Sequence, residues 1–138
     1  MGEHEPPEPR PGDPRPTEEA GTPGIQIVRM TIALSTLEEM AESMFGNLVK
    51  AVVDIDEGIM AVGGEMHADE EALLLVEGSP QPDLWGINLY PAEFATPRFI
   101  EFDSVINIRP RLGNRTRSVD DSAVRATVMA IVDRSVTR

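Results

Sequence analysis

Two apolar runs joined by a short turn are the feature that most constrains what this chain can fold into. Residues 48–55 and 59–64 consist mainly of Val, Ile, Met and Ala, and Asp56-Glu57-Gly58 separates them. Runs of this length and composition around a glycine-containing turn predict a β-hairpin, with Gly58 in the left-handed conformation. The hairpin commits the fold to antiparallel strand pairing, against which the remaining elements must pack.

Further strands and helices are expected on both sides of the hairpin. Strands are predicted over residues 25–32 and 84–90, and residues 99–109 alternate as one long strand or as two strands joined by a bulge. Ser35 to Glu38 has the form of a capping box for a helix over residues 36–45. Asp69 could cap a short helix over residues 70–77, although the apolar run 72–76 could instead be a strand.

The last helix is expected over about residues 120–136, after the cap-like residues 118–121. Together these elements predict an α+β fold. Its sheet should be largely antiparallel, with two main helices packed on one face and a short third helix.

Composition divides the chain into two parts. Residues 1–24 are rich in proline and acidic residues, which predicts a disordered tail, and residues 25–138 are expected to form a single α+β domain. The absence of cysteine excludes disulfides, thiolate nucleophiles and cysteine-type metal sites. Because no apolar run reaches the roughly 18 residues of a membrane span and no secretory signal is visible, we expect a cytoplasmic protein without a membrane partner.

Charge is distributed unevenly. The formal net charge of −12 would repel nucleic acid, which we do not expect as a partner. Yet Arg109, Arg111, Arg115 and Arg117 lie close together, around a Gly-Asn pair that suits a tight turn. A helix N-terminus should follow and would favour an anion. The leading hypothesis is therefore a module that binds a small anionic ligand, a phosphate or a carboxylate, through Arg109, Asn114, Arg115 and Arg117.

Two other interpretations of the same residues remain open. The arginines could pair with acidic side chains of the protein itself, or they could face solvent. The acidic surface as a whole could instead serve a protein-interaction domain that meets a basic partner. The sequence identifies no cofactor and no oligomeric state.

A second group of candidate residues follows the hairpin. If its second strand continued, Glu65, His67 and Asp69 would project from one face. With Asp103 they could serve a hydrolase-like enzyme as general acid/base groups, or as ligands of a divalent metal. His67 is the only histidine in residues 25–138, so a multi-histidine zinc site is excluded. A solvated charge run or a cap at Asp69 are the alternatives.

The polar side of residues 99–109 is the third candidate. Alternation places Glu101, Asp103, Asn107 and Arg109 on one side, opposite the apolar residues, with Asn88 and Tyr90 of a neighbouring strand alongside. Such a surface is either a polar network or the ordinary solvent face of a sheet.

Three separated segments resemble a known family. The stretches "FGNLVKAVVDIDEGIMAVGGEMHADEEALLL", "DLWGINLYP" and "IEFDSVINIRP" with the following "LGNRTR" are similar, in this order, to a family of small uncharacterised prokaryotic proteins, a domain of unknown function. The resemblance covers about residues 25–136 and leaves the proline-rich segment outside. It implies one recurring module and no particular reaction or ligand.

Overall fold

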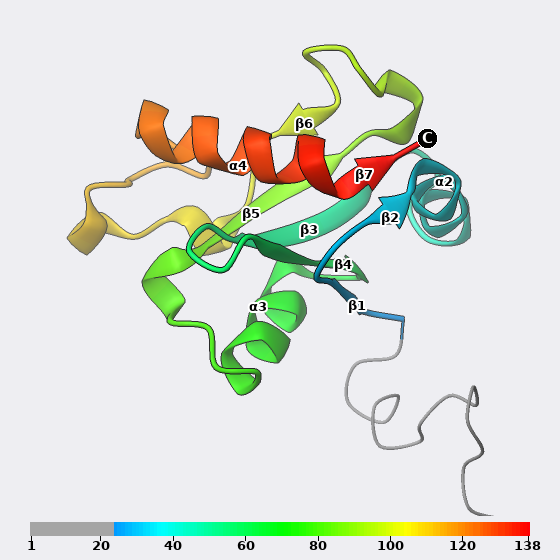
Figure 1. The fold of residues 1–138 in the computed structure, drawn as a ribbon. Coiled ribbons are helices and arrows are strands. Elements are labelled where there is room, and N and C mark those ends of the chain that lie inside the picture. The colour runs from blue at the N-terminus through cyan, green and yellow to red at the C-terminus, as the bar shows by residue number, and fades with distance from the viewer. Residues whose placement is uncertain (1–23) are drawn as a thin grey trace, which may run out of the picture.

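The computed structural model describes residues 24–138. Residues 1–23, where we expect a disordered tail, lie outside this range. The described residues form an α+β fold built on a five-stranded sheet, as Figure 1 shows. The predicted fold class is confirmed.

Every neighbouring pair of strands in the main sheet is antiparallel. The order across the sheet is β1 (Gln26–Val28), β4 (Ile59–Gly64), β3 (Val49–Asp54), β5 (Leu84–Leu89) and β6 (Ile100–Glu101). The strand expected over residues 25–32 is divided, because its end forms β2 (Ile32–Ala33), which pairs in parallel with β7 (Val136–Thr137). This second pair joins the last residues of the chain to the start of the first helix.

The predicted hairpin is the centre of the sheet. Gly58 has a φ of +73°, as its turn requires. Asp54 is fully buried at the end of β3, and one of its carboxylate oxygens accepts the backbone N–H groups of Asp56 and Glu57, each at 2.9 Å. The other oxygen accepts the hydroxyl of Ser79 at 2.6 Å. One carboxylate thus holds both the hairpin turn and the loop after the next helix.

Two helices cover one face of the sheet and one covers the other. α2 (Leu34–Ser43) and α4 (Ser122–Ser135) pack with the alternate residues Ala51 and Val53 of β3 in one apolar cluster. α3 (His67–Val76) packs through Leu74 against Val52 on the opposite face. Because successive strand residues point to opposite faces, the hairpin strands are buried on both sides.

The helix boundaries correct part of the prediction. The capping box at residues 35–38 is wrong, because α2 begins at Leu34 and its N-cap, Ala33, makes no side-chain cap bond. α3 begins at His67 after Met66, so Asp69 lies inside its first turn rather than at its cap, and the alternative of a strand over residues 72–76 is wrong. The predicted cap of the last helix is confirmed at Asp121, which accepts the N–H groups of Ala123 and Val124 at 2.8 and 3.3 Å.

The long strand expected over residues 99–109 does not form. Pairing stops after β6, and the chain turns into a 3-10 turn at Val105–Asn107. Ser104 starts this turn by accepting the N–H of Ile106 at 3.3 Å. Asn107 is consequently fully buried, while Ile108 is exposed. The burial of these two residues is the reverse of what the alternation of polar and apolar residues predicts.

The side chain of Asn107 takes the place of the missing strand. Its amide accepts the N–H of Gly86 at 2.8 Å and donates to the carbonyl of Gly86 at 2.9 Å, as a paired strand would. It also donates to the carbonyl of Arg117 at 2.9 Å. Gly86 is required here, since a Cβ at this position would lie 2.6 Å from the side chain of Ser104. Asn107 therefore occupies the edge of β5 at Gly86, beyond the two residue pairs that β5 forms with β6, and anchors the following loop to β5.

We predict that Asn107→Ala lowers the free energy of unfolding by about 2 kcal/mol or more, because it leaves buried backbone groups of Gly86 and Arg117 unpaired. Urea denaturation followed by circular dichroism measures this. The exposed Asn47→Ala serves as control and should change stability by no more than about 0.5 kcal/mol. Equal effects of the two substitutions would contradict the role of Asn107.

Candidate functional site

Arg109, the first residue of the predicted anion site, is turned inward. Its Nε donates to the carbonyl of Ile106 at 2.9 Å, and its Nη2 donates to the carbonyl of Leu84. The guanidinium lies 4.8 Å from the centre of the Trp85 ring and 3.8 Å from the carboxylate of Glu71. Burial lowers the pKa of Arg109, and Glu71 opposes that shift. Nε and Nη2 of this arginine thus bond to the protein's own backbone, while its buried Nη1 has no hydrogen-bond partner among residues 24–138.

Asn114 is also occupied within the loop. Its amide nitrogen donates to the carbonyls of Asn107, Thr116 and Ser118, and its oxygen accepts the N–H of Asp120 at 2.7 Å. Its exposure is only 3%. The preceding Gly113 has a φ of +82°, which a tight turn at this position needs. Asn114 thus organises the turn before α4.

The other two predicted arginines diverge. Arg117 pairs with Asp103 through a 2.6 Å bond from Nε to Oδ1, while Arg115 is exposed and makes no hydrogen bond within residues 24–138. The hollow beside the loop, about 340 Å³, is lined by Asp120 and Asp121 and by none of the arginines. The structure therefore does not bring Arg109, Asn114, Arg115 and Arg117 together around one cavity. Anion binding by this set stays a prediction.

Glu65, His67 and Asp69 do not share a strand face either. β4 ends at Gly64, and the backbone enters α3 at His67. Glu65 and Asp69 are exposed, whereas His67 is 8% exposed beneath the first turn of α3. The condition for a shared face, a strand that continues past Gly64, is not met, because Met66 already supplies the extended N-cap of the helix.

His67 instead lies near a polar network on the α3 face of the sheet. Hydrogen bonds link the members of this network, which are Asn88, Tyr90, Glu101, Asp103 and Arg117. One oxygen of Glu101 accepts the amide of Asn88 at 2.9 Å and the hydroxyl of Tyr90 at 2.8 Å. The Glu101 bond raises the pKa of Tyr90 to about 12. Lys50, Asp103 and Arg117 are near enough to act on the charge of His67; Lys50 and Arg117 lower its pKa and Asp103 raises it. Residues predicted in three separate candidates thus lie in one region.

The imidazole of His67 is held in one orientation. Its Nε2 lies 2.8 Å from the carbonyl oxygen of Ile87, which can only accept, so Nε2 carries the proton. Nδ1 has no hydrogen-bond partner within residues 24–138 and keeps its lone pair. Burial lowers the pKa of His67, against the opposing effect of the Ile87 bond. A neutral imidazole with a free Nδ1 is chemically a base.

A buried acid on the same helix as His67 escaped sequence analysis. Glu70 is fully buried, and its Oε2 accepts the N–H of Gly64 at 2.8 Å, while its Oε1 has no partner. Burial raises the pKa of Glu70 well above its usual value. The helical spacing to the buried Leu74, four residues later, is the signal that could have identified Glu70 as inward-facing.

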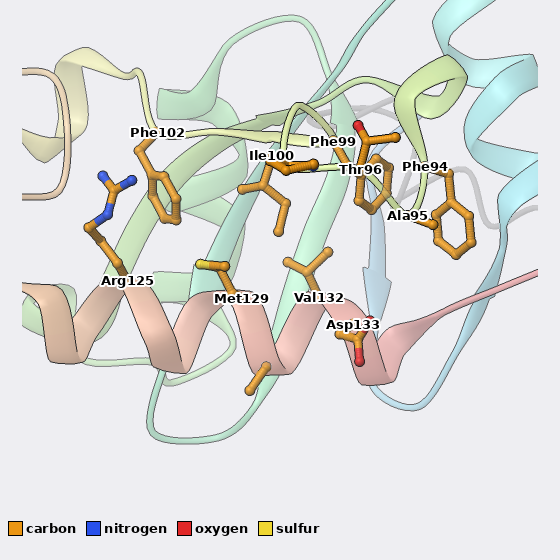
Figure 2. Close-up of a pocket in the computed structure, with 12 residues that line it drawn as sticks. Phe94, Ala95, Thr96, Phe99, Ile100, Phe102, Arg125, Met129, Val132 and Asp133 are labelled. Atoms are coloured by element: carbon orange, nitrogen blue, oxygen red, sulfur yellow. The ribbon is translucent and has the colours of Figure 1, made fainter.

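The largest hollow among those described lies on the other side of the sheet and also escaped prediction. It is an apolar groove of about 770 Å³ between α4 and residues 94–102, as Figure 2 shows. Its walls include Phe94, Phe99 and Phe102, three of the chain's four phenylalanines. That clustering within nine positions was the available sequence signal. We call this hollow the α4 groove.

The α4 groove is charged only at its ends. Figure 2 shows Arg125 at one end, Met129 in the middle and Asp133 at the other end, all from α4. Met129 is 49% exposed there, although it is an apolar side chain. The groove is thus an elongated apolar surface on a strongly acidic protein, with opposite charges at its two ends.

The wall opposite α4 has a fixed shape. Ala95 has a φ of +69°, a left-handed conformation that costs a residue with a Cβ about 1 kcal/mol. Thr96 donates from its hydroxyl to the carbonyl of Glu93 at 2.8 Å, and Arg98 donates to the carboxylate of Glu93 at 3.1 Å. Strained backbone held by such local bonds is often found at ligand sites.

Residues 24–138 contain no group of three or more His, Cys, Asp or Glu side chains arranged to hold a metal ion. Over the same range, each helix is too short or too polar to traverse a bilayer.

The protein is thus a small α+β protein with two candidate sites on opposite faces of an antiparallel five-stranded sheet. One face carries two helices and the apolar groove, and the other carries the third helix and the polar network. The chain belongs to the family described as protein of unknown function (DUF5674), whose match covers residues 26–135. This confirms the resemblance seen in the sequence. No curated protein and no solved structure matches the chain significantly.

We predict that Glu70→Gln removes a pH dependence of stability. The folded state raises the pKa of Glu70 above the usual 4.5. At a pH between 4.5 and the folded-state pKa, Glu70 is therefore protonated in the folded protein and ionised in the unfolded chain. The stability from this proton is complete below pH 4.5 and is lost as pH rises through the folded-state pKa. Urea denaturation should find the variant more stable than wild type at pH 7.5, with no such gain at pH 4. A constant difference between these pH values would contradict this, and the exposed Glu38→Gln is the control.

We also predict that His67 is neutral at pH 7 and carries its proton on Nε2. Long-range ¹H–¹⁵N NMR distinguishes the two tautomers, and His67→Gln identifies the signals because the chain has a second histidine, His4. Titration should give a pKa below 6.5, the usual value. A proton on Nδ1 would show that the Ile87 carbonyl does not hold the ring.

Proposed function

We propose that the protein is a binding module for a small, elongated and mainly apolar ligand, with the α4 groove as its site. The observation that carries this proposal is the open groove itself. Its volume of about 770 Å³ falls within the usual range for small-molecule sites, and its centre is lined by aromatic and aliphatic side chains. The half-exposed Met129 lies in the middle, where a ligand would remove it from water.

This proposal keeps the class of function expected from sequence, a small-ligand binding module, and moves the site. The arginine loop supplies few free groups, because Arg109, Asn114 and Arg117 are already bonded within the protein. The groove is a larger hollow, and its mainly apolar side chains form few hydrogen bonds within the protein. A cytoplasmic location, the absence of a nucleic-acid partner and an interaction role for the acidic surface stay predictions from composition.

Acid/base chemistry at the polar network is the second candidate function. It is supported by the fixed tautomer of His67, whose Nδ1 is free among residues 24–138, and by the nearby Asp103. This retains the expected roles of His67 and Asp103 in a hydrolase-like enzyme, but Glu65 lies exposed on the connection to α3. Replacing His67 by Gln should abolish any hydrolytic activity that purified protein shows, and unchanged activity would eliminate this candidate.

We predict that the full chain binds a neutral apolar fluorophore, N-phenyl-1-naphthylamine, in the α4 groove. Met129→Lys should weaken binding at least about ten-fold, because it places a charge where apolar surface would be buried. Fluorescence titration measures the dissociation constant.

The matched control is Thr127→Lys, on the same helix and outside the groove, which should bind like wild type. Failure of wild type to bind the dye, or equal weakening by both substitutions, would refute the proposed function.

A further inference from the structure

Arg125 is the one cation among the residues that line the α4 groove. Its guanidinium lies 4.2 Å from the centre of the Phe102 ring. Its hydrogen bonds go only to neutral oxygens, the Ser118 hydroxyl at 3.4 Å and the Val119 carbonyl at 3.3 Å. Within residues 24–138 it forms no ion pair with a carboxylate. Although the chain has 24 acidic and 12 basic residues, this half-buried guanidinium has no counter-charge in the part of the chain that the structure describes.

The other end of the groove has the opposite charge. Asp133 follows Arg125 along α4, and Figure 2 shows the two side chains at opposite ends of the apolar lining. An anionic ligand group would be attracted at Arg125 and repelled at Asp133. A second arginine, the exposed Arg138, lies 5.1 Å from the ring of Phe94 but is not among the residues that line the groove.

We propose that the ligand of the α4 groove is a linear aliphatic monocarboxylate. Its carboxylate pairs with Arg125, and its chain runs along α4 past Met129 toward Asp133. The inference rests on the proposed function, since it requires the groove to be a ligand site. A planar guanidinium accommodates a carboxylate through two parallel hydrogen bonds, and one cation neutralises one negative charge. An apolar end of the ligand is required at Asp133, where a second anionic group would be repelled.

The helix sets the length of ligand that fits. α4 rises about 1.5 Å per residue, which separates Arg125 and Asp133 by about 12 Å along its axis. An extended chain advances about 1.2 Å per bond, judged from the polypeptide backbone, so about ten bonds span the groove. Each methylene added up to this length should strengthen binding about four-fold, and longer chains should gain little.

The test is displacement of N-phenyl-1-naphthylamine from the full chain by decanoate and by 1-decanol, below the concentrations at which either self-associates. Wild type should bind decanoate at least about ten-fold more tightly than decanol, because a hydrogen-bonded charge pair forms only with the acid. Arg125→Gln should remove this preference, because it weakens the binding of decanoate far more than the binding of decanol or of the dye. Arg138→Gln, the matched control outside the groove lining, should behave like wild type.

Three results would overturn the inference while leaving the proposed function intact. In the first, wild type binds decanoate and decanol equally. In the second, Arg138→Gln rather than Arg125→Gln removes the preference for decanoate, and in the third, decyl phosphate binds more tightly than decanoate in a manner that depends on Arg125. Absence of dye binding by wild type would refute the proposed function itself. A second copy of the chain could also occupy the groove, and sedimentation at the same protein concentrations tests this. Dimerisation that Met129→Lys reverses would assign the groove to that second copy and overturn the inference.

Discussion

The bonds between the Asn107 side chain and the backbone of Gly86 decide how this molecule is arranged. At Gly86, on the edge of β5, the side-chain amide of Asn107 forms the two hydrogen bonds that a neighbouring strand would otherwise form, one with the N–H and one with the carbonyl of Gly86. The backbone around Asn107 therefore does not pair with β5 as a strand. The residues that follow β6 consequently lie outside the sheet, but successive side chains still point to opposite sides of it. Phe102 reaches the α4 groove, while Asp103 reaches the polar network. A regular strand would have kept more backbone in the sheet and less in the walls of the two sites.

The two candidate sites use the two faces of the sheet in different ways. On the α4 face, apolar residues from distant segments leave a hollow that water fills only at an unfavourable free energy. On the α3 face, titratable groups are partly removed from water, so that Glu70 favours its neutral acid and His67 its neutral imidazole.

Sequence patterns predicted the parts of the fold that depend on local physics. The hairpin around Gly58, the Asp121 cap and the antiparallel sheet follow from turn chemistry, helix capping and periodicity. The strand over residues 99–109 failed because alternation cannot show that Asn107 bonds to a glycine 21 residues earlier. For the same reason, nothing in the arginine loop revealed that Arg109 turns inward. The groove depends on the distance between α4 and residues 94–102, which no local pattern contains.

The position of the chain's only tryptophan has a practical consequence for spectroscopy. Trp85 is 5% exposed, lies beneath the Arg109 guanidinium and lines the small hollow beside the loop with Gly113 and Asp120. Its emission will therefore report the integrity of that loop, through the nearby cation and the entry of water. The α4 groove has no indole in its lining, so occupancy of the groove will be nearly silent in intrinsic fluorescence.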